Sequence, residues 1–332
     1  MKTDLNESLL GRPKGQSCRW PIAVVAGVCT VVGGVLLARR SGFMGGSEAS
    51  TKPPSEPKQR LRIVNGCDTP IWIANFAGAV PYFPDDIRIE GGGSHDYKIP
   101  DEGLAATRFW PKWGCDDQGQ NCRIGGSGGP GEGCIAAGCA PPVDSKFEAS
   151  FGCTKSDPKD CAINPSDPTA HLGPEDWWDV SQVDGWTLPY KVEVFGECDA
   201  PRVIDCSKLS FDSCPKRENL GPKVGNQTLL LLDPSGSGEV VGCYSPCAKL
   251  SYSNWNQGYG FAPETPEAQN YCCPTPPIAP AQCSSGPVIR TAYVQAVHRL
   301  CPSVYAYAYD DGVGLSKCPA GTRYQTTFYC PS

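Results

Sequence analysis

The chain after residue 60 has no excess of basic residues. Residues 61–332 hold 20 Lys and Arg against 31 Asp and Glu, and the whole chain of 332 residues carries a formal net charge of −6. A surface that binds nucleic acid needs Lys and Arg to neutralise phosphates. This composition therefore argues against nucleic acid as a partner.

Signs of a metal or phosphate site are also scarce. The chain has three histidines, and its cysteine spacing lacks the two short pairs of a zinc ribbon. The run Gly125–Gly131 lacks the Gly-Lys-Ser/Thr ending of a phosphate-binding loop, so we predict a surface loop there. We expect no metal and no cofactor. Zinc ligation stays open as an alternative at the cluster of Cys243, Cys247, Cys272, Cys273 and Cys283.

One long apolar run occurs, at residues 20–38, and it contains no charged residue. Nineteen residues at about 1.5 Å each come close to the roughly 30 Å thickness of the bilayer core. We predict a cytosolic tail at 1–19, a transmembrane signal anchor at 20–38, a disordered Pro-containing tether at 39–60 and an ectodomain at 61–332. The alternative is a cleaved signal peptide and a secreted protein.

Cysteine is abundant: the chain has twenty, and eighteen of them follow residue 60. An even number of cysteines in a Gly- and Pro-rich chain is typical of a disulfide-bonded fold in an oxidising compartment. The ectodomain is therefore expected to be extracellular or lumenal. Asn226, followed by Gln227 and Thr228, is a predicted glycosylation site.

Short runs of alternating apolar residues, separated by Gly and Pro, predict an antiparallel β-sandwich or barrel. A helix is predicted from Ile289 to Leu300, with His298 in a packing or capping role. The predicted strands are Leu61–Asn65, Ile71–Phe76, Arg108–Trp110, Lys146–Phe151, Tyr190–Phe195, Thr228–Leu232, Tyr305–Tyr309 and Tyr324–Tyr329.

The stretch Trp177–Trp186 places two carboxylates among bulky apolar residues, and this is a common setting for binding and acid–base sites. In an unbroken strand Asp179 and Asp184 would point to opposite faces, because side chains alternate with a period of two. Both can face one cleft only if the chain bends at Asp184-Gly185. The alternative is that both are solvated edge residues.

Three groups of motifs, in this order along the chain, resemble the thaumatin-like protein family. They are Ile63–Cys67, then Trp178–Ser181 with Val183–Gly185, and then Tyr305–Asp311 with Cys330-Pro331. The resemblance implies an all-β fold, a flattened β-sandwich of about eleven strands. It also implies a disulfide-rich loop and helix subdomain at about 207–301, a small disulfide loop and an acidic cleft.

The resemblance also implies a pattern of disulfides, two of which depart from the family. We expect Cys134 to pair with Cys139 in an altered loop, and Cys153 with Cys161 as an additional local bridge. The family-like pairs are Cys67–Cys330, Cys115–Cys122, Cys198–Cys318, Cys206–Cys301, Cys214–Cys243, Cys247–Cys272 and Cys273–Cys283.

The family's acidic cleft contains one arginine and four carboxylates, and the resemblance carries these roles to Arg108, Glu148, Asp179, Asp184 and Asp310. Four carboxylates around one arginine cannot all be paired. Their mutual repulsion should raise at least one pKa.

The function implied is that of a monomeric defence protein of the cell surface that binds a β-1,3-glucan in this cleft. Carboxylates accept hydrogen bonds from sugar hydroxyls, and aromatic rings cover the apolar side of a sugar. One alternative is a weak endo-β-1,3-glucanase with Glu148 as general acid and Asp184 as base or nucleophile. Another is an enzyme inhibitor or receptor-like surface protein.

Overall fold

The computed structural model describes residues 59–77, 82–84, 86–125, 143–199, 201–233, 235–252 and 258–331. The predicted tail, the anchor at 20–38, nearly all of the tether and the Cys134–Cys139 bridge lie outside these residues. Among the residues that are described, no helix combines the length and apolar character needed to cross a bilayer.

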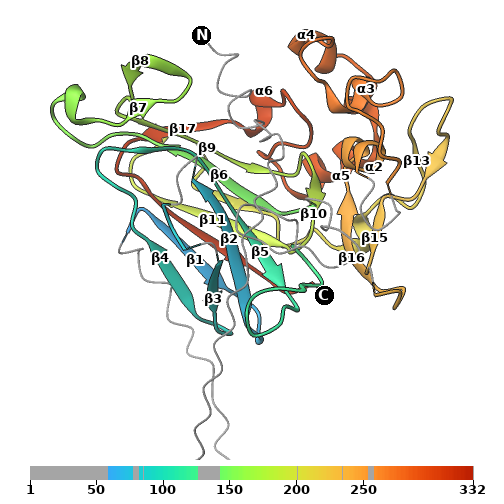
Figure 1. The fold of residues 1–332 in the computed structure, drawn as a ribbon, viewed down its shortest axis with the longest axis horizontal. Coiled ribbons are helices and arrows are strands. Elements are labelled where there is room, and N and C mark those ends of the chain that lie inside the picture. The colour runs from blue at the N-terminus through green and yellow to red at the C-terminus, as the bar shows by residue number, and fades with distance from the viewer. Residues whose placement is uncertain are drawn as a thin grey trace, which may run out of the picture.

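Two large sheets form the body of the protein, and together they have eleven strands (Figure 1). The five-stranded sheet runs in the order β12 (Val203–Asp205), β11 (Tyr190–Phe195), β18 (Arg323–Phe328), β1 (Leu61–Asn65) and β4 (Ser94–Tyr97). The six-stranded sheet runs in the order β17 (Ser316–Pro319), β9 (Glu175–Ser181), β6 (Lys146–Phe151), β5 (Leu104–Trp113), β2 (Ile71–Ala77) and β3 (Asp86–Ile89).

Aromatic side chains fill the space between the two sheets. Tyr324 of the five-stranded sheet lies with its ring centroid 5.7 Å from Phe147 and 5.3 Å from Trp178, both of the six-stranded sheet. Tyr97 and Phe109 meet across the same space at 4.8 Å. All five residues are at most 1% exposed. The predicted all-β sandwich is therefore confirmed.

A disulfide joins the two ends of the domain. β1 and β18 pair in parallel at the centre of their sheet, so their last residues lie side by side. Cys67 and Cys330 follow these two strands and form a bridge across 263 residues of sequence. Cross-linking so long a loop removes on the order of 5 kcal/mol of unfolded-chain entropy in the simplest model.

Eight of the nine expected disulfides are present in the described residues. Cys243 pairs with Cys214, Cys247 with Cys272, and Cys273 with Cys283. The zinc alternative at these cysteines was therefore wrong, because a disulfide sulfur is not a thiolate ligand. The other bridges join Cys115–Cys122, Cys153–Cys161, Cys198–Cys318 and Cys206–Cys301.

Short helices and small sheets lie beside the sandwich; most of them form the disulfide-rich part, whereas the hairpin at residues 163–171 lies at the opposite end of the upper edge of the molecule (Figure 1). The helices are α2 (Pro246–Ser251), α3 (Gln269–Cys272), α4 (Pro280–Cys283), α5 (Ala292–Leu300) and α6 (Asp311–Gly314). The predicted helix at 289–300 is α5, preceded by a 3-10 turn, η4 (Val288–Arg290). The small sheets are β10 (Gly185–Trp186) with β16 (Val240–Tyr244) and β15 (Leu230–Leu232), β13 (Glu218–Asn219) with β14 (Asn226–Gln227), and β7 (Ile163–Asn164) with β8 (Asp167–His171).

The predicted strand Tyr305–Tyr309 was wrong. Only Tyr305 pairs with a strand end, since its amide donates to Val180 O and its carbonyl accepts from Gln182 N. Ser303, two residues before the segment, and Tyr309, its last residue, have positive φ values of 68° and 64°. These left-handed residues turn the chain into a loop, although its tyrosines alternate as in a strand.

The sandwich also begins slightly earlier than predicted. Arg60, which the sequence assigns to the tether, is 8% exposed and forms an ion pair with buried Asp176. Its guanidinium also donates to Gly152 O at 2.9 Å. The folded part therefore includes the last residue of the predicted tether.

The bend expected at Asp184-Gly185 is present. β9 ends at Ser181, the amide of Gly185 donates to Gln182 O at 3.2 Å, and β10 starts at Gly185. Gly185 has a φ of +126°, and a Cβ at this position would lie 2.2 Å from Cys243 O. The turn therefore requires glycine, and it sets the direction of the neighbouring Asp184.

We predict that Gly185→Ala destabilises the protein by about 2 kcal/mol or more, because alanine strains the backbone and collides with Cys243. Thermal unfolding measures the effect. Gly173→Ala is the matched control, since a Cβ there meets no atom within 4 Å. Equal melting temperatures for the two variants would contradict the strained turn.

Candidate functional site

Three of the sequence-predicted residues form one row across the six-stranded sheet. Arg108 on β5 lies opposite Glu148 on β6, and Glu148 lies opposite Asp179 on β9. Directly opposite side chains in an antiparallel pair lie with Cβ atoms about 4.5–5.5 Å apart. Their neighbours along the strands, Phe109 and Phe147 among them, point into the core. The row therefore lies on the face of the sheet that points away from the core.

Arg108 and Glu148 have unused polar groups. Both side chains are partly exposed, and neither forms an ion pair or a side-chain hydrogen bond with another described residue. The guanidinium of Arg108 lies 5.0 Å above the ring of Phe76, its partner on β2. This cation–π contact fixes the position of the guanidinium without using its hydrogen-bond donors.

Asp184 is tied to the same site through Lys146, a residue that our sequence analysis missed. The ammonium of Lys146 forms an ion pair with Asp184 Oδ2, and Tyr252 donates its hydroxyl to Oδ1 at 2.8 Å. Burial favours the neutral form of Asp184, but Lys146, Tyr252 and the charge of Arg108 outweigh it and lower its pKa. Asp184 is therefore an ionised carboxylate with both oxygens occupied.

Lys146 lies two residues before Glu148 on β6, so both point outward. Its side chain is 4% exposed. Burial opposes its charge, but Asp184, Asp144 and Glu148 outweigh that effect and raise the pKa of the ammonium. The period of two along β6 was the signal that could have revealed this residue.

Asp179 is the buried acid of the site. The residue is 4% exposed, and Oδ1 is buried with no hydrogen-bond partner among the described residues. Its pKa is raised well above the usual value, first by burial and then by the charges of Glu148 and Asp311, against the opposing effect of Lys146. The expected pKa elevation within this acidic set therefore falls on Asp179.

Asp310 is bound by a histidine and a backbone amide rather than by residues of the row. Its Oδ2 accepts hydrogen bonds from the amide of Ala306 and from His298 Nε2, the latter at 2.7 Å. The neighbouring Asp311 is exposed, and its Oδ1 accepts the hydroxyl of Tyr305 at 2.5 Å. Of this Asp-Asp pair, Asp311 is the residue whose charge acts on Asp179.

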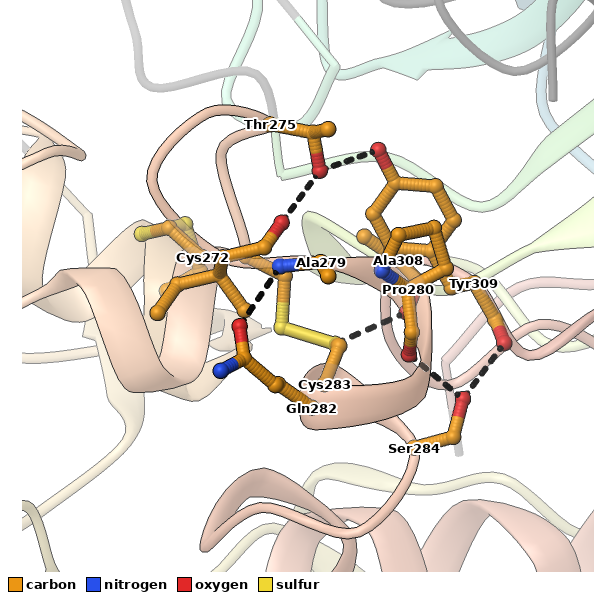
Figure 2. Close-up of a disulfide and its surroundings, with 12 residues drawn as sticks. Cys272, Thr275, Ala279, Pro280, Gln282, Cys283, Ser284, Ala308 and Tyr309 are labelled. Carbon is orange, nitrogen blue, oxygen red and sulfur yellow. Dashed lines mark hydrogen bonds between the residues drawn. A yellow bond between two sulfur atoms is a disulfide. The ribbon is translucent and has the colours of Figure 1, made fainter.

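The loop that carries these two aspartates is fastened to the disulfide-rich part (Figure 2). The hydroxyl of Tyr309 donates to Thr275 Oγ1 at 2.8 Å, and Ser284 Oγ donates to Tyr309 O at 3.4 Å. Cys283, bridged to Cys273, lies with its sulfur 3.2 Å from Ala308 O. The Cys273–Cys283 bridge thus helps to position Tyr305 and Asp311 at the site.

The structure thus unites Arg108, Glu148, Asp179 and Asp184 and ties Asp310 to His298. Four further residues join the site: Lys146, Tyr252, Tyr305 and Asp311. Asp311 could have been found because it adjoins Asp310. No signal in the sequence connects Tyr252 to Asp184, since 67 residues separate them in the chain and only the fold brings them together.

The fold and site define a disulfide-stabilised β-sandwich protein with an acidic row on one outer sheet face. Residues 65–331 match the model of the thaumatin family. The chain therefore belongs to that family.

Named relatives agree with this assignment. The pathogenesis-related thaumatin-like protein 3.5 of Cryptomeria japonica is 28% identical over 279 residues, covering 81% of this chain and 89% of the relative. The glucan endo-1,3-beta-glucosidase of Prunus avium is 30% identical over 203 residues, covering 58% and 68%.

A solved structure, the laminaripentaose-producing β-1,3-glucanase of GH family 64 from Paenibacillus barengoltzii, is 13% identical. It covers 82% of this chain and 76% of its own, with a TM-score of 0.43. That likeness is too distant to bear on function.

We predict that Asp179→Asn stabilises the protein increasingly as the pH rises. The raised pKa means that the folded state holds the proton of Asp179 more tightly than the unfolded state. The stability from this group is fully present below the unfolded pKa of about 3.9 and is lost as the pH rises through the folded pKa.

Urea unfolding of both proteins at several pH values measures this effect. The difference in unfolding free energy should be near zero at about pH 4 and grow with pH, by up to about 1.4 kcal/mol for each pH unit, until the folded pKa is passed. A difference that does not change with pH would contradict the raised pKa.

Proposed function

We propose that this protein binds a β-1,3-glucan along the row formed by Arg108, Glu148 and Asp179. The observation that carries the proposal is the unused hydrogen-bonding capacity of Arg108 and Glu148, which are partly exposed side by side on adjacent strands. A neutral sugar has hydroxyls that both donate and accept hydrogen bonds. Glu148 accepts from such hydroxyls, and Arg108 donates to their oxygens.

The rest of the site keeps this pair in place. Lys146 balances the charge of Asp184, so the row stays assembled without using the Arg108 guanidinium. The raised pKa of Asp179 favours its neutral form, which competes less with the ligand for Arg108. The names of two relatives, a pathogenesis-related protein and a glucan endo-1,3-beta-glucosidase, support a defence role involving this polysaccharide.

We further propose that residues 20–38 anchor the protein in a membrane, with a monomeric, oxidised domain on the extracellular or lumenal side. Eight disulfides within the described residues support an oxidising compartment. Asn226 is exposed on β14, as a glycosylated residue must be. Cleavage after the apolar run, which would yield a secreted form, is the alternative.

We predict that Glu148→Gln and Arg108→Gln each lower retention on insoluble β-1,3-glucan at least about tenfold. This is the loss of affinity expected when one hydrogen bond to a charged group is removed. Neither residue has an ion-pair partner among the described residues, so the melting temperature should not change. A pull-down with measured bound fraction tests this.

Glu90→Gln is the matched control for these variants, because Glu90 is an exposed residue just after β3 with a 68% exposed side chain. Its retention should equal that of the wild type. Undiminished retention by both cleft variants would count against the proposed row.

Hydrolysis of the glucan is the second candidate function, with Glu148 as general acid and Asp184 as base or nucleophile. The arrangement of two carboxyl groups favours it, since Asp179, whose pKa is raised, lies directly opposite Glu148, and glycoside hydrolysis uses a pair of carboxyl groups. Against it, the Asp184 carboxylate is occupied by Lys146 and Tyr252. Binding is therefore the first proposal.

Reducing-sugar release from β-1,3-glucan separates the two functions. If the protein hydrolyses the polymer, Glu148→Gln should lower the rate by about 100-fold or more, the usual contribution of a general acid. Equal release by wild type and variant would exclude Glu148 as the acid.

A further inference from the structure

A small cavity lies next to the proposed row, at one end of β6 and β9. Its volume is about 100 Å³, and it is enclosed between the sheet and the β7–β8 hairpin. Figure 1 shows this hairpin at the opposite end of the upper edge of the molecule from α3 and α4. The residues that carry the argument below are Ser150, Trp177, Asn164 and Ser166, and all four line the cavity.

The cavity lies beside the proposed row, displaced from it along the strands. Ser150 and Trp177 are cross-strand partners, two residues further along β6 and β9 than Glu148 and Asp179. Side chains two residues apart in a strand point to the same face and lie about 7 Å apart. A ligand that extends from the row in the strand direction therefore reaches Trp177 with its next ring.

Three polar side chains of the cavity have hydrogen-bonding capacity that the described residues leave unused. Ser166 Oγ is buried and has no hydrogen-bond partner among the described residues. The side-chain nitrogen of Asn164 has no bond there either, although its Oδ1 accepts from the amide of Ser166 at 3.0 Å. Ser150 Oγ accepts from the amide of Ala106, so its own proton is free to be donated.

A buried hydroxyl without a partner costs free energy unless water or a ligand supplies one. A cavity of this volume that contains several polar groups holds water when no ligand is bound. The hydroxyls of a sugar can replace such water and keep its hydrogen bonds, while the indole of Trp177 offers an apolar surface to the ring. This combination is suited to one edge of a neutral hexose.

The hairpin that closes the cavity is held rigidly. Cys153 and Cys161 form the bridge at its base, and the amide of Leu172 donates to Ala162 O at 2.8 Å. His171 Nδ1 lies 2.6 Å from Cys161 O. The wall is therefore preorganised, and little conformational entropy is lost when a ligand binds.

We propose that this cavity is an additional sugar subsite, in which Trp177, Ser166 and Asn164 bind the unit of a β-1,3-glucan that follows the one on the Arg108–Glu148 pair. The proposal rests on the proposed glucan-binding function. It adds that the affinity for a glucan depends on the number of its sugar units. The longer glucans gain affinity by reaching the cavity closed by the β7–β8 hairpin, which the Cys153–Cys161 bridge holds in place.

The test is calorimetric titration of the whole protein with β-1,3-linked glucose oligomers, from the disaccharide to the hexasaccharide. For the wild type, affinity should rise when the oligomer becomes long enough to reach Trp177. Ser166→Ala and Trp177→Ala should bind the shorter oligomers as the wild type does and lose this rise. We expect a loss of roughly fivefold for Ser166→Ala, the worth of one hydrogen bond, and more for Trp177→Ala.

Three further variants serve as references. Glu148→Gln should bind every oligomer more weakly, because it alters the shared row. Ser285→Ala, a serine of the disulfide-rich part outside both sites, should match the wild type. Trp177→Phe should restore part of the rise, since phenylalanine keeps an aromatic surface.

Each contrary outcome has a distinct meaning. If Ser166→Ala and Trp177→Ala bind all lengths as the wild type does, the cavity holds water only and the subsite is wrong. If they lose affinity equally at every length, their effect is structural and the subsite is again wrong, while the row stands. If the wild type binds no oligomer, both the subsite and the proposed function fall.

Discussion

The register between β5, β6 and β9 determines where the charges of the site lie. Because side chains in a strand alternate, a slip of one residue would turn Glu148 into the core and Phe147 outward. The aromatic core between the two sheets excludes that slip, since Phe147 packs against Tyr324 and Trp178. The packing of the sandwich thus places Arg108, Glu148 and Asp179 in one row on the opposite face.

The row brings acidic groups together at partly buried positions, and two features of the structure reduce the electrostatic repulsion between them. Lys146 supplies a buried positive charge to Asp184, and the environment of Asp179 favours the neutral acid. Breaking a buried ion pair by removing one partner is strongly destabilising. Asp184 is therefore a structural support of the site as well as a part of it, and Arg108 and Glu148 are left for a ligand.

Sequence reasoning reached a large part of this picture. The alternation in Lys146–Phe151 and the Asp184-Gly185 turn follow from local rules. The eight observed disulfides and the placement of Arg108, Glu148 and Asp179 at one site follow the resemblance. Local rules failed at Tyr305–Tyr309, where alternating tyrosines look like a strand but left-handed residues bend the chain. They also could not find the contact of Tyr252 with Asp184, which depends on tertiary packing alone. The predictions for residues 20–38 and for Cys134–Cys139 fall outside the described residues.

A crystal structure of the protein bound to a β-1,3-linked glucose oligomer tests the central claim most directly. The account predicts a sugar ring over the row, with its hydroxyls within hydrogen-bond distance of the Arg108 guanidinium and the Glu148 carboxylate. A sugar bound elsewhere on the molecule, with these two side chains free of contact, would contradict it.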